Sequence, residues 1–113
     1  MTPNGAIIHH PTSSPEALRA WKNLHTLLGQ ERPGYILWAL NDDLTPLFQH
    51  IQIQSEESVY RIVPFLIAPG KHFQEDITHV EEKLSAKRPD LRFERAPVLL
   101  EDQIFLNNWI SRL

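Results

Sequence analysis

The stretch SVYRIVPFLIAPG, residues 58–70, decides how the rest of the chain can be arranged. From Ile62 to Ala68 it is an unbroken apolar run rich in residues that favour strands, and Pro69-Gly70 ends it. Strands without polar alternation are typical of parallel sheets, whose two faces are both covered by helices. We therefore predict a central parallel strand here, in a protein of the α/β class.

Strand and helix patterns alternate on either side of this segment. The short apolar runs GAIIHH and YILWAL predict two strands before it, and LRFERAPVLL predicts one after it. The predicted strands span 5–10, 35–40, 58–70 and 91–100, and the predicted helices span 15–29, 41–51, 71–88 and 101–113. Such alternation predicts a three-layer α/β sandwich, a four-stranded parallel sheet of order 2-1-3-4 flanked by helices, in one domain covering 1–113.

Three of the helices carry local signals of different kinds. For the first, Ser14 is a candidate N-cap, Pro15 occupies the first turn and Gly29 offers a left-handed stop. Pro46 is expected to interrupt the second, which reads as a short helix or a turn. The third carries acids early and bases late, and it stops before Pro89. The residues predicted to face the core are Leu18, Trp21, Leu24, Leu27 and Leu28 in the first helix and Phe73, Ile77, Val80 and Leu84 in the third.

Composition narrows the possible functions. With 113 residues and 42% hydrophobic content the chain fits one core, and a net charge of -3 lacks the basic footprint of a nucleic-acid binder. No cysteine is present, so any metal ligand must be His, Asp or Glu. No apolar stretch approaches the roughly 20 residues of a membrane span, and we expect a soluble cytoplasmic protein. The four scattered glycines form neither a phosphate loop nor the elbow of a serine hydrolase.

Three histidines lie at the ends of predicted strands, where a sheet of this kind forms its binding or catalytic site. His9 and His10 end the first predicted strand, and His72 follows the third. Sites in open α/β sheets form at the carboxyl ends of the strands, and strands one and three are neighbours in the order 2-1-3-4. Imidazole can bind Co, Ni, Fe or Zn, or accept a proton near neutral pH. We therefore predict a site for metal handling or acid–base chemistry, whereas the other three histidines, at positions 25, 50 and 79, are expected at the surface.

Two segments resemble the signatures of the small sirohydrochlorin chelatases, which insert a metal ion into a tetrapyrrole. They are AIIHHPTSSPEA at 6–17 and IVPFLIAPGKHFQEDI at 62–77, the second being the more specific. His10 and His72 fall on the two histidines of that family. In the first segment His9 stands where the family has glycine, and PTSS follows His10 where the family has Gly-Ser-Arg-Asp.

The resemblance implies a lyase that inserts Co²⁺, Ni²⁺ or Fe²⁺ into sirohydrochlorin, on a route to sirohaem, cobalamin or a nickel cofactor. The metal is then a substrate, and no permanently bound cofactor is expected. His10 and His72 would hold the metal or accept pyrrole protons, with His9 as a further candidate ligand. Glu75 and Asp76 would orient an imidazole or add charge.

Other residues receive weaker assignments. Lys71, Gly70 and Thr12 are candidates for substrate binding, Lys71 through a substrate carboxylate. Trp38 would pack on a macrocycle or, more simply, in the core. Glu75 and Asp76 are placed in a first helical turn, where they would favour the helix dipole whatever their chemistry.

Two further readings stay open beside the chelatase. One is a non-catalytic module that binds a metal or tetrapyrrole, which the altered first segment would allow. The other is a structural or partner-binding relative whose histidines are idle. Because the chain resembles one lobe of larger two-lobed chelatases, we also expect a homodimer with two-fold symmetry.

Overall fold

The computed structural model describes residues 4–11, 14–66, 71–95 and 98–99, with the backbone alone at 65–66, 71–73 and 98–99. The elements are β1 (Asn4–His9), α1 (Pro15–Glu31), β2 (Tyr35–Ala39), α2 (Thr45–Gln52), β3 (Val59–Leu66), α3 (Lys71–Lys87), β4 (Arg92–Arg95) and β5 (Val98–Leu99). The predicted helix at 101–113 lies outside the described residues.

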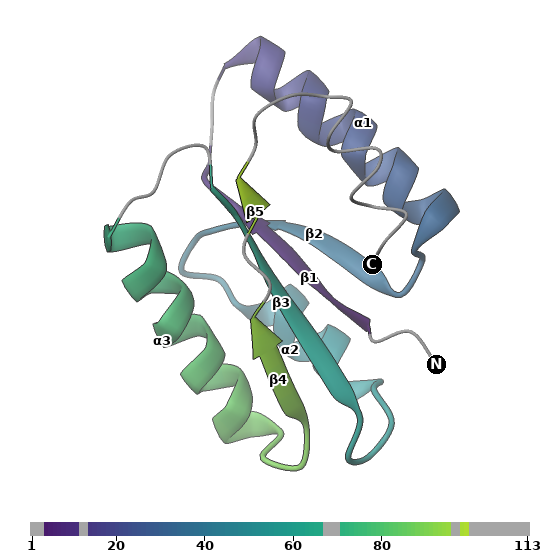
Figure 1. The fold of residues 1–113 in the computed structure, drawn as a ribbon, viewed down its shortest axis with the longest axis vertical. Helices are drawn as coiled ribbons and strands as arrows, with labels where there is room; N and C mark the ends of the chain where they lie inside the picture. The colour runs from purple at the N-terminus through teal and green to yellow at the C-terminus, as the bar shows by residue number, and fades with distance from the viewer. Residues whose placement is uncertain (1–3, 12–13, 67–70, 96–97, 100–113) are drawn as a thin grey trace.

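The strands form one parallel sheet around β3, which confirms the predicted order. Its sequence across the sheet is β2-β1-β3-β4, and each pairing is parallel (Figure 1). The single strand expected over 91–100 is instead two short strands: β4 pairs with the first half of β3, and β5 pairs with Phe65 and Leu66 at its end. The stretch SVYRIVPFLIAPG is therefore central, as its apolar run predicts, with β3 ending at Leu66.

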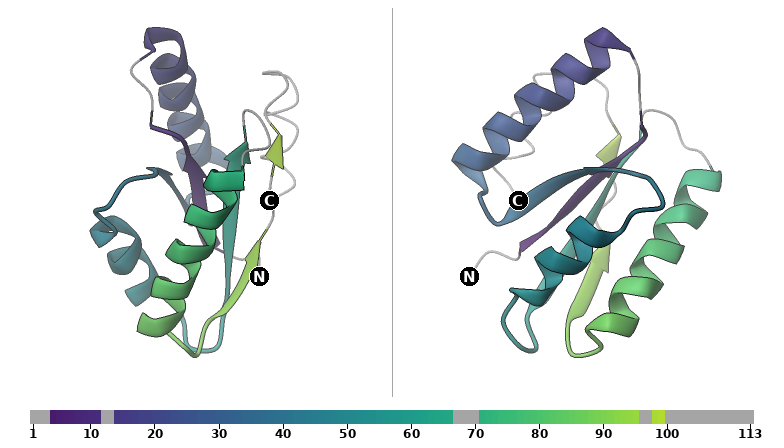
Figure 2. Two further views of the ribbon diagram at one scale, coloured as in Figure 1. Left: turned by 90° about the vertical axis from the view of Figure 1, so that its left-hand side faces the viewer. Right: turned by 180° about the vertical axis from the view of Figure 1, so that it is seen from behind.

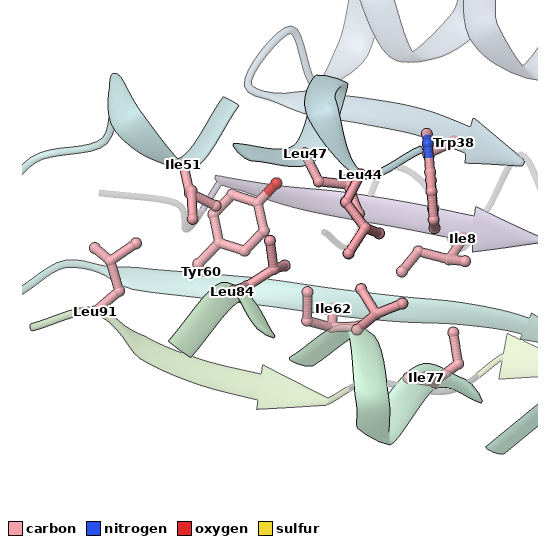
Figure 3. Packing of buried hydrophobic residues seen from close by; sticks show 12 residues of the cluster. Ile8, Trp38, Leu44, Leu47, Ile51, Tyr60, Ile62, Ile77, Leu84 and Leu91 are labelled. Atoms are coloured by element: carbon pink, nitrogen blue, oxygen red, sulfur yellow. The ribbon is translucent and has the colours of Figure 1, made fainter. Parts of the chain in front are cut away.

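Helices cover both faces of this sheet, as two views from different sides show (Figure 2). Ile7 of β1 and Val63 of β3 pack with α1, while Ile8 and Ile62 pack with α2 and α3. Neighbouring residues of a strand point to opposite faces, so apolar runs of this kind supply two cores at once. The larger core lies under α2 and α3 (Figure 3), and Trp38 belongs to it. The simpler reading of Trp38, as a core residue, is thus confirmed.

Helix α1 begins as predicted but differs from its prediction at the carboxyl end and in the exposure of Leu18. Ser14 caps it and Pro15 opens it as expected, but the helix runs past Gly29 to Glu31. Gly29 does not take a left-handed conformation. The end is closed instead by the Arg32 N–H, which donates to the Leu28 carbonyl at 2.8 Å. Leu18, expected in the core, is 51% exposed, because the first turns of α1 extend beyond the end of the sheet (Figure 1).

The short helix α2 begins at Thr45 and holds Pro46 in its first turn, so it is not interrupted by this proline. Proline fits the first turn because its missing N–H would have no partner there. In α3 the expected face is confirmed for Ile77, Val80 and Leu84, all of them buried. The side chain of Phe73 lies outside the described residues.

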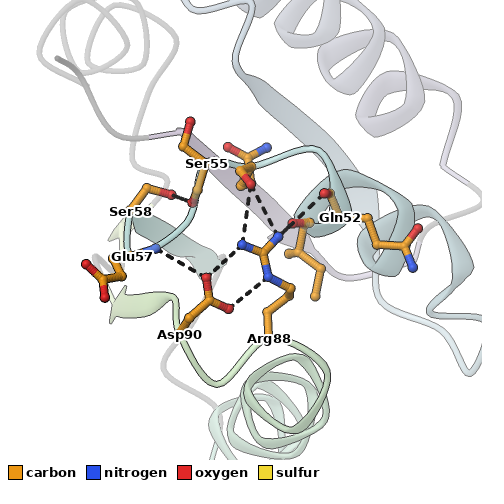
Figure 4. Close-up of polar contacts among 8 residues, drawn as sticks. Gln52, Ser55, Glu57, Ser58, Arg88 and Asp90 are labelled. Carbon is orange, nitrogen blue, oxygen red and sulfur yellow. Dashed lines mark hydrogen bonds and ion pairs between the residues drawn. The ribbon is translucent and has the colours of Figure 1, made fainter.

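One polar cluster ties three segments together at the amino ends of β3 and β4 (Figure 4). Arg88, just after α3, donates to the carbonyls of Ile51 at 2.6 Å and Gln54 at 3.3 Å, at the end of α2. It also forms a two-bond pair with Asp90, at 2.9 and 2.8 Å. Asp90 accepts in turn from the backbone N–H of Glu57. Arg88 therefore satisfies carbonyls that the last turn of α2 leaves without helical partners.

Candidate functional site

His10 and the start of α3, where two of the predicted site segments lie, both follow strands at the carboxyl edge of the sheet. β1 ends at His9, next to Ala39 at the end of β2, and His10 follows. Helix α3 begins at Lys71, after the neighbouring strand β3. The backbone thus brings His10 and the first turn of α3 to one edge of the sheet. Thr12 and Gly70 lie outside the described residues, as do the side chains of Lys71 and His72.

His9 lies under helix α1 and is only 7% exposed. Its ring stacks on that of Trp21, with 4.2 Å between centroids and 18° between planes. Nδ1 lies 2.7 Å from the carbonyl oxygen of His10. Burial lowers the pKa of His9 below its usual 6.5, although the hydrogen bond to His10 opposes this. His9 is therefore neutral near pH 7 and packed inside the protein.

The loop after β2 begins beside the end of β1, because the Leu40 N–H donates to the His9 carbonyl at 2.9 Å. Asn41 and Asp43 serve the loop itself: Asn41 Oδ1 accepts from the Asp43 N–H, and Asp43 Oδ1 accepts from the Thr45 N–H. The bonds from Thr45 hold the pKa of Asp43 below its usual value. Asp42 is left to face a groove next to this loop.

That groove, of about 390 Å³, lies between the loop and one face of α3. Its charged and titratable lining consists of Asp42, Asp76, His79 and Lys83, with apolar residues of the loop and of α3 beneath them. Sequence reasoning took His79 for an ordinary surface residue and gave Lys83 no part in the site. The signal that could have placed them here is their spacing, since 76, 79 and 83 fall on one helical face.

Glu75 and Asp76 are exposed, and they lie in the second turn of α3 because the helix begins at Lys71. The placement in the first turn is therefore wrong, as the first turn holds no acid. Helix-dipole effects fade beyond the first turn, so the dipole explains these acids poorly. Asp76 instead contributes to the wall of the groove.

The remaining histidines divide into two kinds. His25 and His79 are exposed as expected. His50 is not a surface residue: it is partly buried, and its Nδ1 lies 2.6 Å from the hydroxyl of the buried Tyr60. The approach of α2 to β3 creates this contact, and neighbouring residues in the sequence do not reveal it.

A larger hollow of about 500 Å³ lies at the opposite end of the sheet, lined partly by Arg88 and Asp90. Each nitrogen of the Arg88 guanidinium already has a protein acceptor there. Ligands of open α/β sheets bind at the carboxyl edge, and this hollow lies at the amino edge. The Arg88 and Asp90 contacts beside this hollow therefore hold neighbouring segments together, and we call them the Arg88 clamp.

Within the described residues, no three His, Asp or Glu side chains gather in the way a metal ion would need. In the same part of the chain, no helix has the length and apolar character that crossing a membrane requires.

Comparison with solved structures identifies the fold. The chain superposes on the putative cobalamin (vitamin B12) biosynthesis CbiX protein from Marinobacter aquaeolei VT8, with a TM-score of 0.63 and 17% sequence identity. The match covers 98% of this chain and 92% of that protein. This chain has the CbiX fold. At this identity the likeness concerns the fold alone, and neither a family model nor a curated protein matches the sequence.

The CbiX-like fold confirms the α/β architecture expected from the resemblance to the small chelatases. The match extends over almost all of both chains, so the two proteins correspond as whole domains.

Proposed function

We propose that this protein is a chelatase that inserts Co²⁺, Ni²⁺ or Fe²⁺ into sirohydrochlorin or a related tetrapyrrole. The observation that carries the proposal is the position of His10 and the start of α3, which follow adjacent parallel strands at the carboxyl edge of a CbiX-like sheet. The CbiX protein with this fold is described as a cobalamin biosynthesis protein, which fits that substrate class. A cytoplasmic location is part of the proposal, on the evidence of the sequence.

Metal insertion into a tetrapyrrole requires groups that accept protons and groups that bind the metal ion. Insertion of a divalent ion removes two protons from pyrrole nitrogens, and the ion must give up part of its water shell. Neutral imidazoles can do both tasks, because they bind first-row ions and accept protons near pH 7. In the proposal His10 and His72 take these roles, with His9 as a further candidate. Lys71, with Gly70 and Thr12, would meet the carboxylates of the macrocycle.

The acids of the groove would support the metal. Asp76 and Asp42 line one groove beside the edge where β1 and β2 end. Carboxylates near an imidazole ligand orient it or attract the cation. Glu75, exposed one residue earlier, has the same proposed role.

A homodimer completes the proposal. A flat macrocycle is best enclosed between two surfaces, and one sheet edge of this chain offers a single surface. A second copy related by a two-fold axis would supply the other.

A non-catalytic module that binds the metal or the tetrapyrrole is the second candidate. The segment after His10 favours this candidate. Pro11 restricts the backbone there, at a position where the chelatase family that this segment resembles has a glycine. Such a module would bind its ligand without accelerating metallation.

The test is anaerobic incubation of the protein with sirohydrochlorin and each of Co²⁺, Ni²⁺ and Fe²⁺, followed by the visible spectrum. We expect faster metallation than without protein, and loss of that gain in His10→Ala and in His72→Ala. His25→Ala is the matched control, since His25 is an exposed histidine of α1, and it should keep the full rate.

A rate equal to the protein-free rate would refute the enzyme. If metal or tetrapyrrole then still bound, the non-catalytic module would be the better function. Binding that neither His10→Ala nor His72→Ala reduces would refute the site in both forms.

A further inference from the structure

The backbone on both sides of His10 is held by hydrogen bonds. On one side, the carbonyl of His9 accepts from the Leu40 N–H at 2.9 Å. On the other side, the carbonyl of His10 lies 2.7 Å from Nδ1 of His9. A carbonyl oxygen can only accept, so Nδ1 must carry the hydrogen. The two peptide groups that flank the Cα of His10 are therefore both pinned.

The imidazole that makes the second of these bonds is itself enclosed by neighbouring side chains. It stacks on Trp21 of α1 with nearly parallel planes, and it is 7% exposed. The bond at His10 thus runs from a ring held by a helix to a carbonyl beyond the end of the strand. Pro11 comes next, and its restricted φ limits the chain further.

We propose that His9 is a positioning residue, which holds the backbone of His10 so that the His10 side chain is presented at the carboxyl edge. This inference rests on the proposed function, in which His10 meets the metal. His9 acts through its Nδ1–H and its stacking, and it does not itself touch the ion. Its enclosed position against Trp21 favours this role over that of a ligand.

Two substitutions separate the stacking of the His9 ring from its hydrogen-bond donor. His9→Phe keeps an aromatic ring on Trp21 but removes the donor. His9→Asn removes the ring but keeps an N–H donor, because the side-chain nitrogen of asparagine is as many bonds from Cα as Nδ1 of histidine. His10→Ala and His25→Ala complete the set, the second as an exposed-histidine control.

The measurement is a Co²⁺ titration of each variant, read from the visible absorption of the bound ion, beside a thermal melt. We expect His9→Phe to melt close to the wild type and to bind Co²⁺ about 10-fold more weakly, the lower end of the effect of losing an outer hydrogen bond at a metal site. His9→Asn should recover much of that affinity, with an unchanged cobalt spectrum. His25→Ala should match the wild type throughout.

Three other patterns of Co²⁺ affinity among these variants would overturn the inference, each for a different reason. Loss of binding in His10→Ala with wild-type affinity in His9→Phe would overturn the positioning role alone. Wild-type affinity in both variants would overturn the proposed function as well. If His9→Asn bound as weakly as His9→Phe and altered the cobalt spectrum, His9 would be a ligand.

Discussion

At the scale of single residues, the partly buried His50 and the buried Tyr60 form a polar pair at the main core. The Tyr60 hydroxyl is 2.6 Å from Nδ1 of His50, and the two rings meet edge to face at 5.5 Å. Tyr60 is fully buried, and burial raises the pKa of its hydroxyl, so the hydroxyl keeps its proton and can donate this bond. Nδ1 can accept it only while His50 is neutral. Burial lowers the pKa of His50, which keeps the ring in that form.

This pair predicts a loss of stability in mild acid. The pKa of His50 is below 6.5 in the folded protein and about 6.5 when the chain unfolds. The stabilisation is therefore complete above about pH 6.5 and declines as pH falls from there toward the folded pKa. We expect the free energy of unfolding in urea to drop between pH 7.5 and 5.5, and to drop less in His50→Asn, which keeps an acceptor that does not titrate.

The control for this prediction is His25→Asn, since His25 is exposed. It should show the same pH dependence as the wild type. Some dependence should also survive in His50→Asn, because the pKa of His9 is lowered too. Identical pH profiles for His50→Asn and the wild type would contradict the role of His50.

At the scale of elements, the Arg88 clamp links the end of α2, the turn before β3 and the start of β4. Helix α2 is short, and the carbonyls at its end need hydrogen-bond donors from outside the helix. Arg88 donates to the carbonyl of Ile51 and to that of Gln54 just beyond the helix. The pair with Arg88 also holds the pKa of Asp90 well below its usual value. The geometry needs the planar fork of a guanidinium, which a lysine lacks.

We therefore expect Arg88→Lys to lower the melting temperature of the protein by several degrees. Arg19→Lys is the matched control, because Arg19 is exposed on α1, and it should leave the melting temperature unchanged. Circular dichroism during heating measures both. Equal melting of Arg88→Lys and the wild type would show that the clamp does not stabilise the contact between α2 and the α3–β4 turn.

At the scale of the whole molecule, the proposed site lies at one edge of a sheet only four strands wide along its main path. The groove between the β2–α2 loop and α3 lies beside that edge. The expected homodimer would place two such edges against one macrocycle.

We expect the purified protein to sediment as a dimer at micromolar concentration, because a shared cleft requires both copies. Analytical ultracentrifugation measures this directly, with and without the tetrapyrrole. A monomer under both conditions that still accelerates metallation would show that one chain suffices.

Periodicity in the sequence predicted the elements well where burial is uniform. The apolar run around Ile62 predicted a central strand, and the spacing of Ile77, Val80 and Leu84 predicted a buried helical face. The structure confirms both. The prediction from periodicity failed where burial or the end of a helix depends on contacts with other parts of the chain. Leu18 has the spacing of the buried face but is exposed, and the helix continues past Gly29 to Glu31, where Arg32 closes it.

The sequence by itself determined the class of fold, the strand order and the placement of His10 and the start of α3 after neighbouring strands, because these follow from hydrophobic pattern and from the rules of parallel sheets. Only the tertiary structure decided that His9 is clamped on Trp21, that Asp42 shares a groove with Lys83, and that His50 is buried with Tyr60. These contacts join residues from different elements. Their geometry depends on how helices and loops pack over the sheet, and no local pattern carries that information.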